Sequence, residues 1–474
     1  TIDRYYKEVV MENILNKKES GWKSLSSGEM DSIMTFSDNY IKFLNRSKTE
    51  REANKSIILE LEKHGFRNVN DMDRLSAGDK VYFSNRCKSV FAAVIGSGKI
   101  DEGINIVGAH IDSPRLDLKP NPVYEDGKLA LFKTHYYGGI KKYQWTTIPL
   151  AIHGVVVKPS GEKISINIGE DENDPIFTIT DLLPHLAKDQ VDKKLEEAIK
   201  GESLNILIGS IPGEEKENPV KNNILKILNE KYGINEIDFY SSELEVVPAF
   251  KARSLGFDSS MVAGYGQDDK VCAYATLRAI IDASVTSVTS VSIFADKEEI
   301  GSVGNTGMYS EMFDNFILQL LEKTGDNSVG SLNKTYCNSR MLSADVGAGV
   351  DPNYQEVSES NNSSYIGYGV ELNKYTGARG KSGASDANAE FVAYVRRVFE
   401  SNNVKYQVSE LGKVDIGGGG TIAYILANKG IDVIDCGVPV ISMHSPYEVT
   451  SKYDIYSAYN GYKAFFEATD KVSY

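Results

Sequence analysis

The sequence has little cysteine. Its 474 residues include four cysteines, Cys87, Cys272, Cys337 and Cys436, which are widely spaced and form no Cys-x-x-Cys pair. A disulfide scaffold and a thiolate zinc site both need clustered cysteines, so the sequence argues against both. The pattern is typical of a protein from a reducing compartment, and we expect a cytoplasmic location.

Long apolar runs and an excess of positive charge are also absent. No stretch approaches the about 18 consecutive apolar residues of a membrane-spanning helix, and the first residues, TIDRYYKEVVMENILNKKESG, lack the apolar core of a signal peptide. Lys and Arg number 52 against 66 Asp and Glu, which gives a net charge of −14. We therefore expect no membrane partner and no nucleic-acid partner.

The length and the change of sequence character along the chain predict two domains. A chain of 474 residues exceeds the size at which a single core stops growing. After Pro120 the sequence becomes loop-rich, with a Lys- and Glu-rich helical segment, LAKDQVDKKLEEAIKG, and the earlier character returns near Gly256. We predict catalytic parts at residues 1–118 and 255–474, with an inserted domain at residues 119–254.

Hydrophobic periodicity predicts an α/β fold outside the insertion. Residues 31–66 show helical spacing of apolar residues, with Ser47 to Glu50 matching a capping box and Gly65 a helix stop. Short β-rich runs follow from Lys80, and after Gly256 strands alternate with helices. This order predicts a mixed, mostly parallel sheet flanked by helices on both faces.

Residues with metal-binding side chains follow four apolar runs. INIVGA is followed by His110, VSIFA by Asp296, Glu298 and Glu299, MLSA by Asp345, and VPVISM by His444. Ligand sites of open α/β sheets lie beyond the carboxyl ends of the strands, so we expect one convergent site. A single histidine after a strand would more often be a core residue, and two adjacent glutamates are often only solvated.

Three details refine the predicted chemistry. Asp112 follows His110 by two residues and can support it from behind, and Glu298 and Glu299 can divide ligation from proton transfer. Asp268 and Asp269 begin a predicted helix, where capping is the commoner role, although a carboxylate can also bridge two cations. The glycines 417–420 lack the Lys-Ser or Lys-Thr of a phosphate loop, so nucleotide binding is disfavoured.

The donor types point to particular metals. Two histidines, two terminal carboxylates and one bridging aspartate bring three negative charges against the four positive charges of two divalent ions, and a hydroxide would balance the remainder. Mixed nitrogen and oxygen donors suit zinc, cobalt or manganese better than calcium. We expect two divalent ions, with zinc first.

Five segments together resemble the aspartyl aminopeptidase family of metallopeptidases. They are GAHIDSPRLDLKP, GYGQDDK, DKEEIGSVG, SADVGAGVDPNY and SMHSPYE, in the family's order and over nearly the whole chain. The resemblance implies an α/β catalytic domain with an inserted β-rich dimerisation domain. The chain departs from the commonest pattern beside the ligands, with DKEE where an Asn often precedes the glutamates and with HSPYE in place of HSIRE.

The resemblance also implies roles for individual residues. His110 and Asp345 would be terminal ligands of one metal, Glu299 and His444 would complete the shell of the other, and Asp268 would bridge them. Glu298 would be the general base, Asp112 would support His110, and His153 in LAIH would reach the active site of a neighbouring subunit. Family members form dimers that assemble into a tetrahedral dodecamer, so we expect a homo-oligomer.

The resulting hypothesis is a zinc-dependent aminopeptidase that removes the N-terminal residue, acidic or other, from peptides. Lys374 and Arg379 in NKYTGARGKSG could recognise an acidic side chain, or could be a solvated basic loop. A two-metal deacylase or carboxypeptidase would use nearly the same ligands. A catalytically silent assembly protein of the same fold is the alternative outside enzymology.

Overall fold

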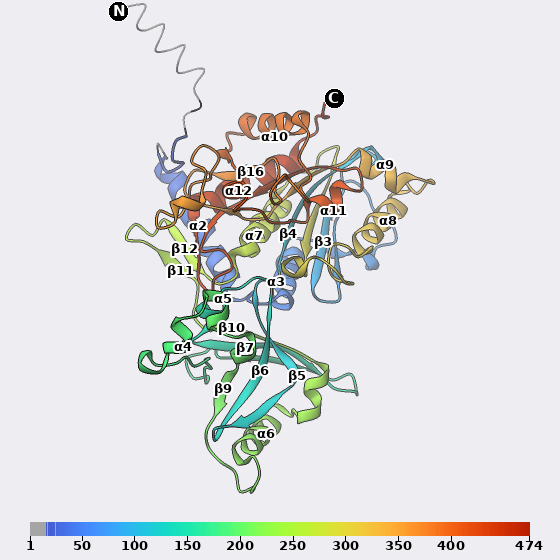
Figure 1. The fold of residues 1–474 in the computed structure, drawn as a ribbon. Coiled ribbons are helices and arrows are strands. Elements are labelled where there is room, and N and C mark those ends of the chain that lie inside the picture. Colours follow the sequence, from blue (N-terminus) through green and yellow to red (C-terminus); the bar gives the residue numbers. More distant parts are fainter. Residues whose placement is uncertain (1–15, 17, 24) are drawn as a thin grey trace, which may run out of the picture.

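The computed structural model describes residues 16, 18–23 and 25–474. The predicted absence of a signal peptide rests mostly on residues outside this range. A nine-stranded sheet forms the centre of the larger part of the molecule (Figure 1). Its strands, in spatial order, are β1 (Arg67–Asn68), β2 (Lys80–Asn85), β3 (Ser89–Val94), β13 (Thr289–Ala295), β4 (Ile104–His110), β14 (Arg340–Ser343), β18 (Asp432–Gly437), β16 (Val370–Asn373) and β17 (Tyr406–Val408).

Helices cover both faces of this sheet, because side chains alternate along its buried strands. In β4, Val107 and Ala109 pack into one core while Ile104 and Ile106 pack into another. The first core contains residues of α2 (Ser27–Asn45), α3 (Glu50–Lys63), α7 (Gln267–Asp282), α10 (Ala389–Ser401) and α12 (Lys452–Glu467). The second contains residues of α8 (Met312–Thr324), α9 (Ser331–Cys337) and α11 (Ala423–Ala427). The predicted mixed α/β architecture is confirmed.

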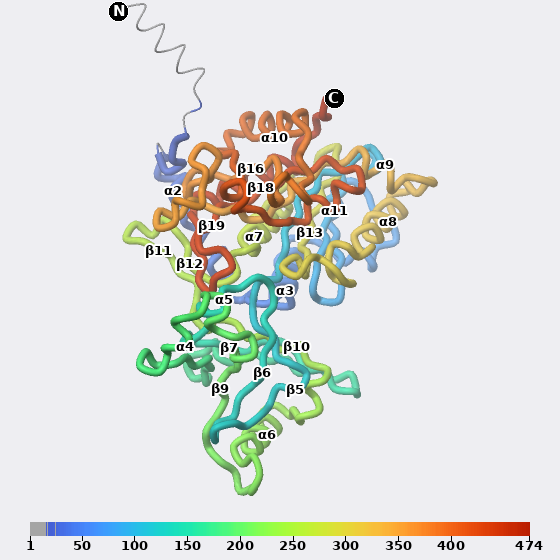
Figure 2. Tube along the Cα trace, in the orientation of Figure 1, coloured from blue at the N-terminus to red at the C-terminus, as the bar shows by residue number. Residues whose placement is uncertain are grey.

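A second, antiparallel sheet lies beside the larger part. Its strands, in spatial order, are β8 (Lys163–Ile168), β7 (Leu150–Val157), β10 (Ser242–Pro248), β5 (Arg115–Asp126), β6 (Leu129–Tyr137) and β9 (Ile206–Gly209). This part of the chain also contains α4 (Lys188–Val191), α5 (Leu195–Ala198) and α6 (Pro219–Tyr232), and it has its own core around Trp145. Figure 2 shows that the chain leaves the larger part before β5 and returns to it after β10.

A small third sheet completes the larger part. It consists of β11 (Arg253–Leu255), β12 (Met261–Gly264), β20 (Glu448–Ser451), β19 (Pro439–Ile441) and β15 (Gly347–Ala348). It brings the segment after β19 next to the segment that begins α7, since β12 and β19 both pair with β20. Within the described part of the chain, no helix is long and apolar enough to cross a membrane.

One local prediction was wrong, and one predicted helical segment is divided in two. The capping box of α3 is Thr49 with Glu52, because the hydroxyl of Ser47 is buried and donates to Ser56 instead. The Lys- and Glu-rich segment forms the two short helices α4 and α5 in place of one helix. Leu186, Val191 and Leu195 in this segment are exposed, so it lacks the packed apolar face that usually stabilises a longer helix.

Helix α3 offers a matched test of the first core. Leu61 is completely buried there, whereas Leu59 on the same helix is 57% exposed. We expect Leu61→Ala to lower the free energy of unfolding by about 2–5 kcal/mol, because it removes buried methyl groups and leaves a cavity. Leu59→Ala should change it by about 0.5 kcal/mol or less. Urea denaturation followed by circular dichroism measures both, and equal effects would contradict the described packing.

Candidate metal centre

Three neighbouring strands of the central sheet end at the centre of the site. β4 pairs in parallel with β13 and with β14, so their carboxyl ends meet at one edge of the sheet. His110 is the last residue of β4, Asp345 is the second residue after β14, and a short 3-10 turn after β13 contains Glu298 and Glu299. The sequence predicted this convergence from the residues that follow each apolar run.

Asp268 lies between two histidines. Its Oδ1 is 3.1 Å from Nε2 of His110, and its Oδ2 is 3.1 Å from Nε2 of His444. Asp268 stands at the start of α7 in non-helical backbone, and its peptide bond to Asp269 is cis. One carboxylate therefore faces two imidazoles, with one oxygen for each.

His444 reaches the site by a different route from the one expected. It follows β19, which belongs to the small third sheet and not to the central sheet. The prediction that all four apolar runs deliver their residues from one sheet edge was therefore wrong for this run. The short run VPVISM does not distinguish the two sheets, because both contain buried strands.

Three further carboxylates surround this arrangement. Glu299 Oε2 is 3.5 Å from Nε2 of His444, Asp345 Oδ1 is 3.8 Å from Nε2 of His110, and Glu298 Oε2 is 3.9 Å from the same atom. Single ligand atoms of His110, Asp268 and Glu299 all lie within 4.8 Å of one another, as do those of His110, Glu298 and Asp345. The groups are thus within reach of common points at which cations could bind.

Burial and mutual repulsion shift the pKa values of these carboxyl groups. Burial raises the pKa of Glu298 to about 7, and Asp112 and Asp268 add to the effect. Burial also raises the pKa of Glu299 and of Asp345, with further contributions from neighbouring carboxylates. Burial alone would raise the pKa of Asp268 too, but hydrogen bonds from His110 and His444 lower it below its usual range.

The side chains present fit divalent metal ions. Six buried carboxylate oxygens in the described part of the chain have no hydrogen-bond partner, and two of them, Oε1 of Glu299 and Oδ1 of Asp269, belong to this site. Buried carboxylates are normally paired or bind metals. Imidazole nitrogens and carboxylate oxygens together, without a thiolate, are the donor set that zinc and similar ions accept.

Asp112 holds other residues of the site in place through hydrogen bonds. Its carboxylate accepts hydrogen bonds from the backbone N–H groups of Glu298 and Glu299, both at 3.2 Å. Its Oδ1 is also 3.2 Å from Nδ1 of His110. Asp112 thus holds the histidine ring and the turn that contains both glutamates.

Sequence reasoning missed Glu448, which supports the other half of the site. Its buried carboxylate accepts hydrogen bonds from the backbone N–H groups of His444 at 2.8 Å, Gln267 at 2.6 Å and Asp268 at 3.2 Å. Glu448 closes the SMHSPYE segment, so the motif contained the signal. Its role did not follow from the pattern, since no apolar run precedes it.

The structure does not bring His153 and Lys374 to this cluster. His153 is buried with Nδ1 2.8 Å from Glu52 and Nε2 3.0 Å from Glu170, both in its own chain. Lys374 is exposed and lies 3.8 Å from Asp386. The loop around Arg379 is exposed as well.

A pocket of about 1050 Å³ opens over the carboxylates. Asp268, Glu298, Glu299 and Asp345 form part of its wall. Neutral side chains contribute much of the remainder, among them Ile140, Tyr143, Tyr354, Leu411 and Tyr424. Lys141 is the cationic side chain among the described residues that line it.

Comparison with known proteins agrees with this site. Residues 43–466 match the family described as aminopeptidase I zinc metalloprotease (M18). A probable M18 family aminopeptidase 1 from Clostridium acetobutylicum is 52% identical over 460 residues, which cover 96% of this chain and 99% of that protein.

Solved structures show the same fold. The crystal structure of an M18 family aminopeptidase from Thermotoga maritima is 47% identical, with a TM-score of 0.92 over 96% of this chain and all of that one. A yeast structure described as the mApe1 dodecamer is 20% identical, with a TM-score of 0.74 over 92% of this chain and 97% of that one, and so shares the fold. This chain therefore belongs to the M18 family of zinc metalloprotease aminopeptidases.

Proposed function

We propose that this aminopeptidase holds two zinc ions and uses Glu298 as its general base. The observation that carries the proposal is the position of Asp268, with one carboxylate oxygen 3.1 Å from each of two histidine nitrogens. A carboxylate placed in this way can bridge two cations. His110 and Asp345 would hold one ion and Glu299 and His444 the other, with cobalt or manganese able to replace zinc.

Two bound zinc ions would supply Lewis-acid polarisation of the scissile carbonyl and a water of lowered pKa. Glu298 would take the proton from that water and pass it to the leaving amine. The carboxyl group of Glu298 lines the pocket in which a peptide would bind, which suits it to this role. Asp112 would keep Glu298 in place through the backbone N–H.

The resulting reaction would be the removal of the N-terminal residue from peptides. The free α-amine of a peptide would donate hydrogen bonds to the carboxylates that line the pocket. A peptide with a blocked N-terminus has no such amine and would lack these contacts. This requirement separates the proposal from a deacylase or carboxypeptidase with the same ligands. Membership of the aminopeptidase family supports the same choice, and it disfavours a silent assembly protein.

Glu298→Gln tests the assignment of the base. We expect the variant to keep two zinc ions per chain and to lose about 100- to 10,000-fold in kcat, because an amide cannot accept the proton. Metal analysis and a peptidase assay measure the two quantities. Glu322→Gln, at an exposed position on α8, is the matched control and should leave both unchanged. Loss of zinc from Glu298→Gln would show that Glu298 is a ligand.

The pocket favours an uncharged N-terminal side chain. Lys374 and Arg379 are not among its lining residues, and Lys141 lines it together with five carboxylates, Asp268, Glu298, Glu299, Asp345 and Asp351. An acidic substrate side chain would be buried beside like charges. We therefore propose that the neutral residues lining the pocket, in place of Lys374, determine which N-terminal side chain is preferred.

Substrate preference can be measured directly. We expect kcat/KM for a Leu-linked substrate to exceed that for the Asp- and Glu-linked analogues by at least about tenfold, since a buried carboxylate without a partner is costly. The three substrates differ only in the N-terminal residue, so each serves as a control for the others. Faster cleavage of the acidic substrates would contradict the neutral pocket.

We also propose that the chain assembles into dimers through residues 119–254, and the dimers into a tetrahedral dodecamer in the cytoplasm. The separate antiparallel sheet at residues 115–248 and the yeast relative described as a dodecamer support this assembly. His153 would then approach a neighbouring subunit's site only if its contacts with Glu52 and Glu170 opened.

Native mass spectrometry tests the assembly. We expect the dominant species to have the mass of a dodecamer of the 52.2 kDa chain, with dimers on dilution. A monomer at all concentrations would contradict the proposal.

A further inference from the structure

The segment Tyr137–Gly139, at the end of β6, contacts the metal centre from the antiparallel-sheet part of the chain. The hydroxyl of Tyr137 donates a hydrogen bond of 2.8 Å to Oδ2 of Asp112. The carbonyl of Gly139 accepts one of 2.8 Å from Nδ1 of His444. Three consecutive residues thus reach two different halves of the site.

Gly138 allows this close approach. Its φ is +73°, and a Cβ at this position would lie 3.3 Å from both Cβ and Oε2 of Glu299. A side chain here would press on a predicted zinc ligand. The segment is therefore fitted against Glu299 as well as hydrogen-bonded to Asp112 and His444.

Tyr137 is one of four residues that contact the carboxylate of Asp112. Oδ2 of Asp112 accepts the Tyr137 hydroxyl and the backbone N–H of Glu299, while Oδ1 faces the backbone N–H of Glu298 and Nδ1 of His110. The Tyr137 hydroxyl is the side-chain donor that fixes Oδ2. Without it, the carboxylate could rotate away from the geometry that serves His110 and the two glutamates.

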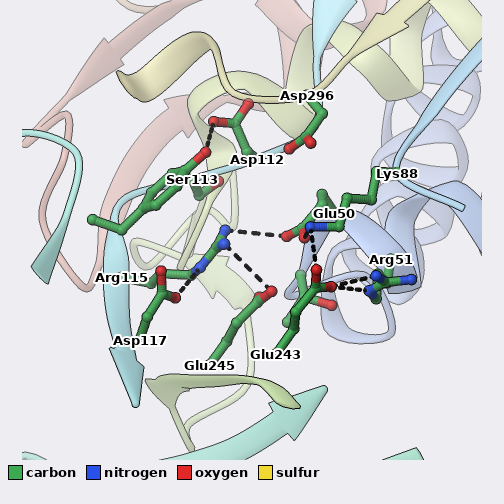
Figure 3. Close-up of polar contacts among 12 residues, drawn as sticks. Glu50, Arg51, Lys88, Asp112, Ser113, Arg115, Asp117, Glu243, Glu245 and Asp296 are labelled. Atoms are coloured by element: carbon green, nitrogen blue, oxygen red, sulfur yellow. Dashed lines mark hydrogen bonds and ion pairs between the residues drawn. The ribbon is translucent and has the colours of Figure 1, made fainter. Parts of the chain in front are cut away.

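The ring of Tyr137 is itself held by Arg115. The guanidinium carbon of Arg115 lies 4.0 Å from the centre of the ring, and the two residues are paired across β5 and β6. Arg115 in turn contacts three carboxylates: Asp117 at 2.8 Å, Glu50 at 3.1 Å and Glu245 at 3.3 Å (Figure 3).

These contacts join the two sheets beneath the metal centre. Glu50 is in α3, beside the central sheet, and Glu245 is in β10 of the antiparallel sheet. Lys88 extends the network, 3.6 Å from Glu50 and 3.1 Å from Glu243, and the network is buried around Arg115 (Figure 3). Three ion pairs leave the side chain of Arg115 little conformational freedom, so the ring of Tyr137 that packs against it is rigid.

We propose that Tyr137 is a positioning residue for the metal centre, acting through Asp112, and that the antiparallel-sheet part thereby completes the active site of its own chain. This inference rests on the proposed two-zinc function. It assigns the Tyr137 hydroxyl a role in metal affinity and turnover beyond packing. The segment fixes Asp112 through its hydroxyl and His444 through its carbonyl.

Tyr137→Phe removes the hydroxyl and keeps the ring over Arg115. We expect zinc affinity, measured by competition with a chelator, to fall by about 10- to 100-fold, as is usual when a group behind a metal ligand is lost. We expect kcat to fall by a similar factor, while KM changes by no more than about twofold because the pocket wall is intact.

Tyr136→Phe is the matched control. Tyr136 is the adjacent residue on β6 and is 43% exposed, so the same chemical change there should alter neither zinc affinity nor kcat. If Tyr137→Phe bound zinc as tightly as the wild type, or if it failed to fold, the positioning role would be overturned in favour of a structural one.

A double-mutant cycle shows whether Tyr137 acts through Asp112. Asp112→Asn should weaken zinc binding, and adding Tyr137→Phe to it should cause little further loss, because the two residues share one interaction. Fully additive losses would contradict the route through Asp112. A wild-type chain that bound no zinc would refute the proposed two-zinc function. That result differs from the one that would refute the role of Tyr137, so the two hypotheses fail on different measurements.

Discussion

The structure depends on how it accommodates a group of carboxylates at the ends of buried strands. Asp268 is compensated by two histidines, whereas burial and then neighbouring carboxylates raise the pKa values of Glu298, Glu299 and Asp345. Burying such groups without positive charge costs several kcal/mol for each charge. The fold is therefore suited to binding cations, which agrees with its membership of a family of zinc enzymes.

Two further carboxylates keep this group in order. Asp112 holds the backbone of Glu298 and Glu299, and Glu448 holds the backbone of Asp268 and His444. Each uses both of its oxygens: Asp112 fixes two adjacent residues of one turn, and Glu448 fixes two residues from different segments. Burial would raise the pKa of Asp112, but hydrogen bonds from His110 and Tyr137 lower it, whereas burial raises the pKa of Glu448 to about 8.

The sequence allowed much of the site to be predicted, for a physical reason. β4, β13 and β14 lie in the middle of the sheet and are buried on both faces, so they read as continuous apolar runs with an abrupt polar end. His110, the glutamates and Asp345 occupy those ends. The helices around them follow from spacing and caps, except where Ser47 is buried and Thr49 caps α3 instead.

The remaining features depend on contacts between distant segments. His444 comes from a sheet that no local pattern distinguishes from the central one, and Glu448 acts through backbone N–H groups. Tyr137 is the last residue of an ordinary amphipathic strand, and its partner Asp112 is 25 residues away. Periodicity reports which face of a strand is buried, but it does not report what that face meets.

The segment after β6 also has a consequence for how this enzyme could diversify. Ile140, Lys141, Tyr143 and Gln144 line the pocket but contribute none of the proposed metal ligands. Mutations there could reshape the cleft for other peptides while the hydrolytic machinery stayed untouched. Deleting the antiparallel-sheet part of the chain would therefore also remove one wall of the pocket.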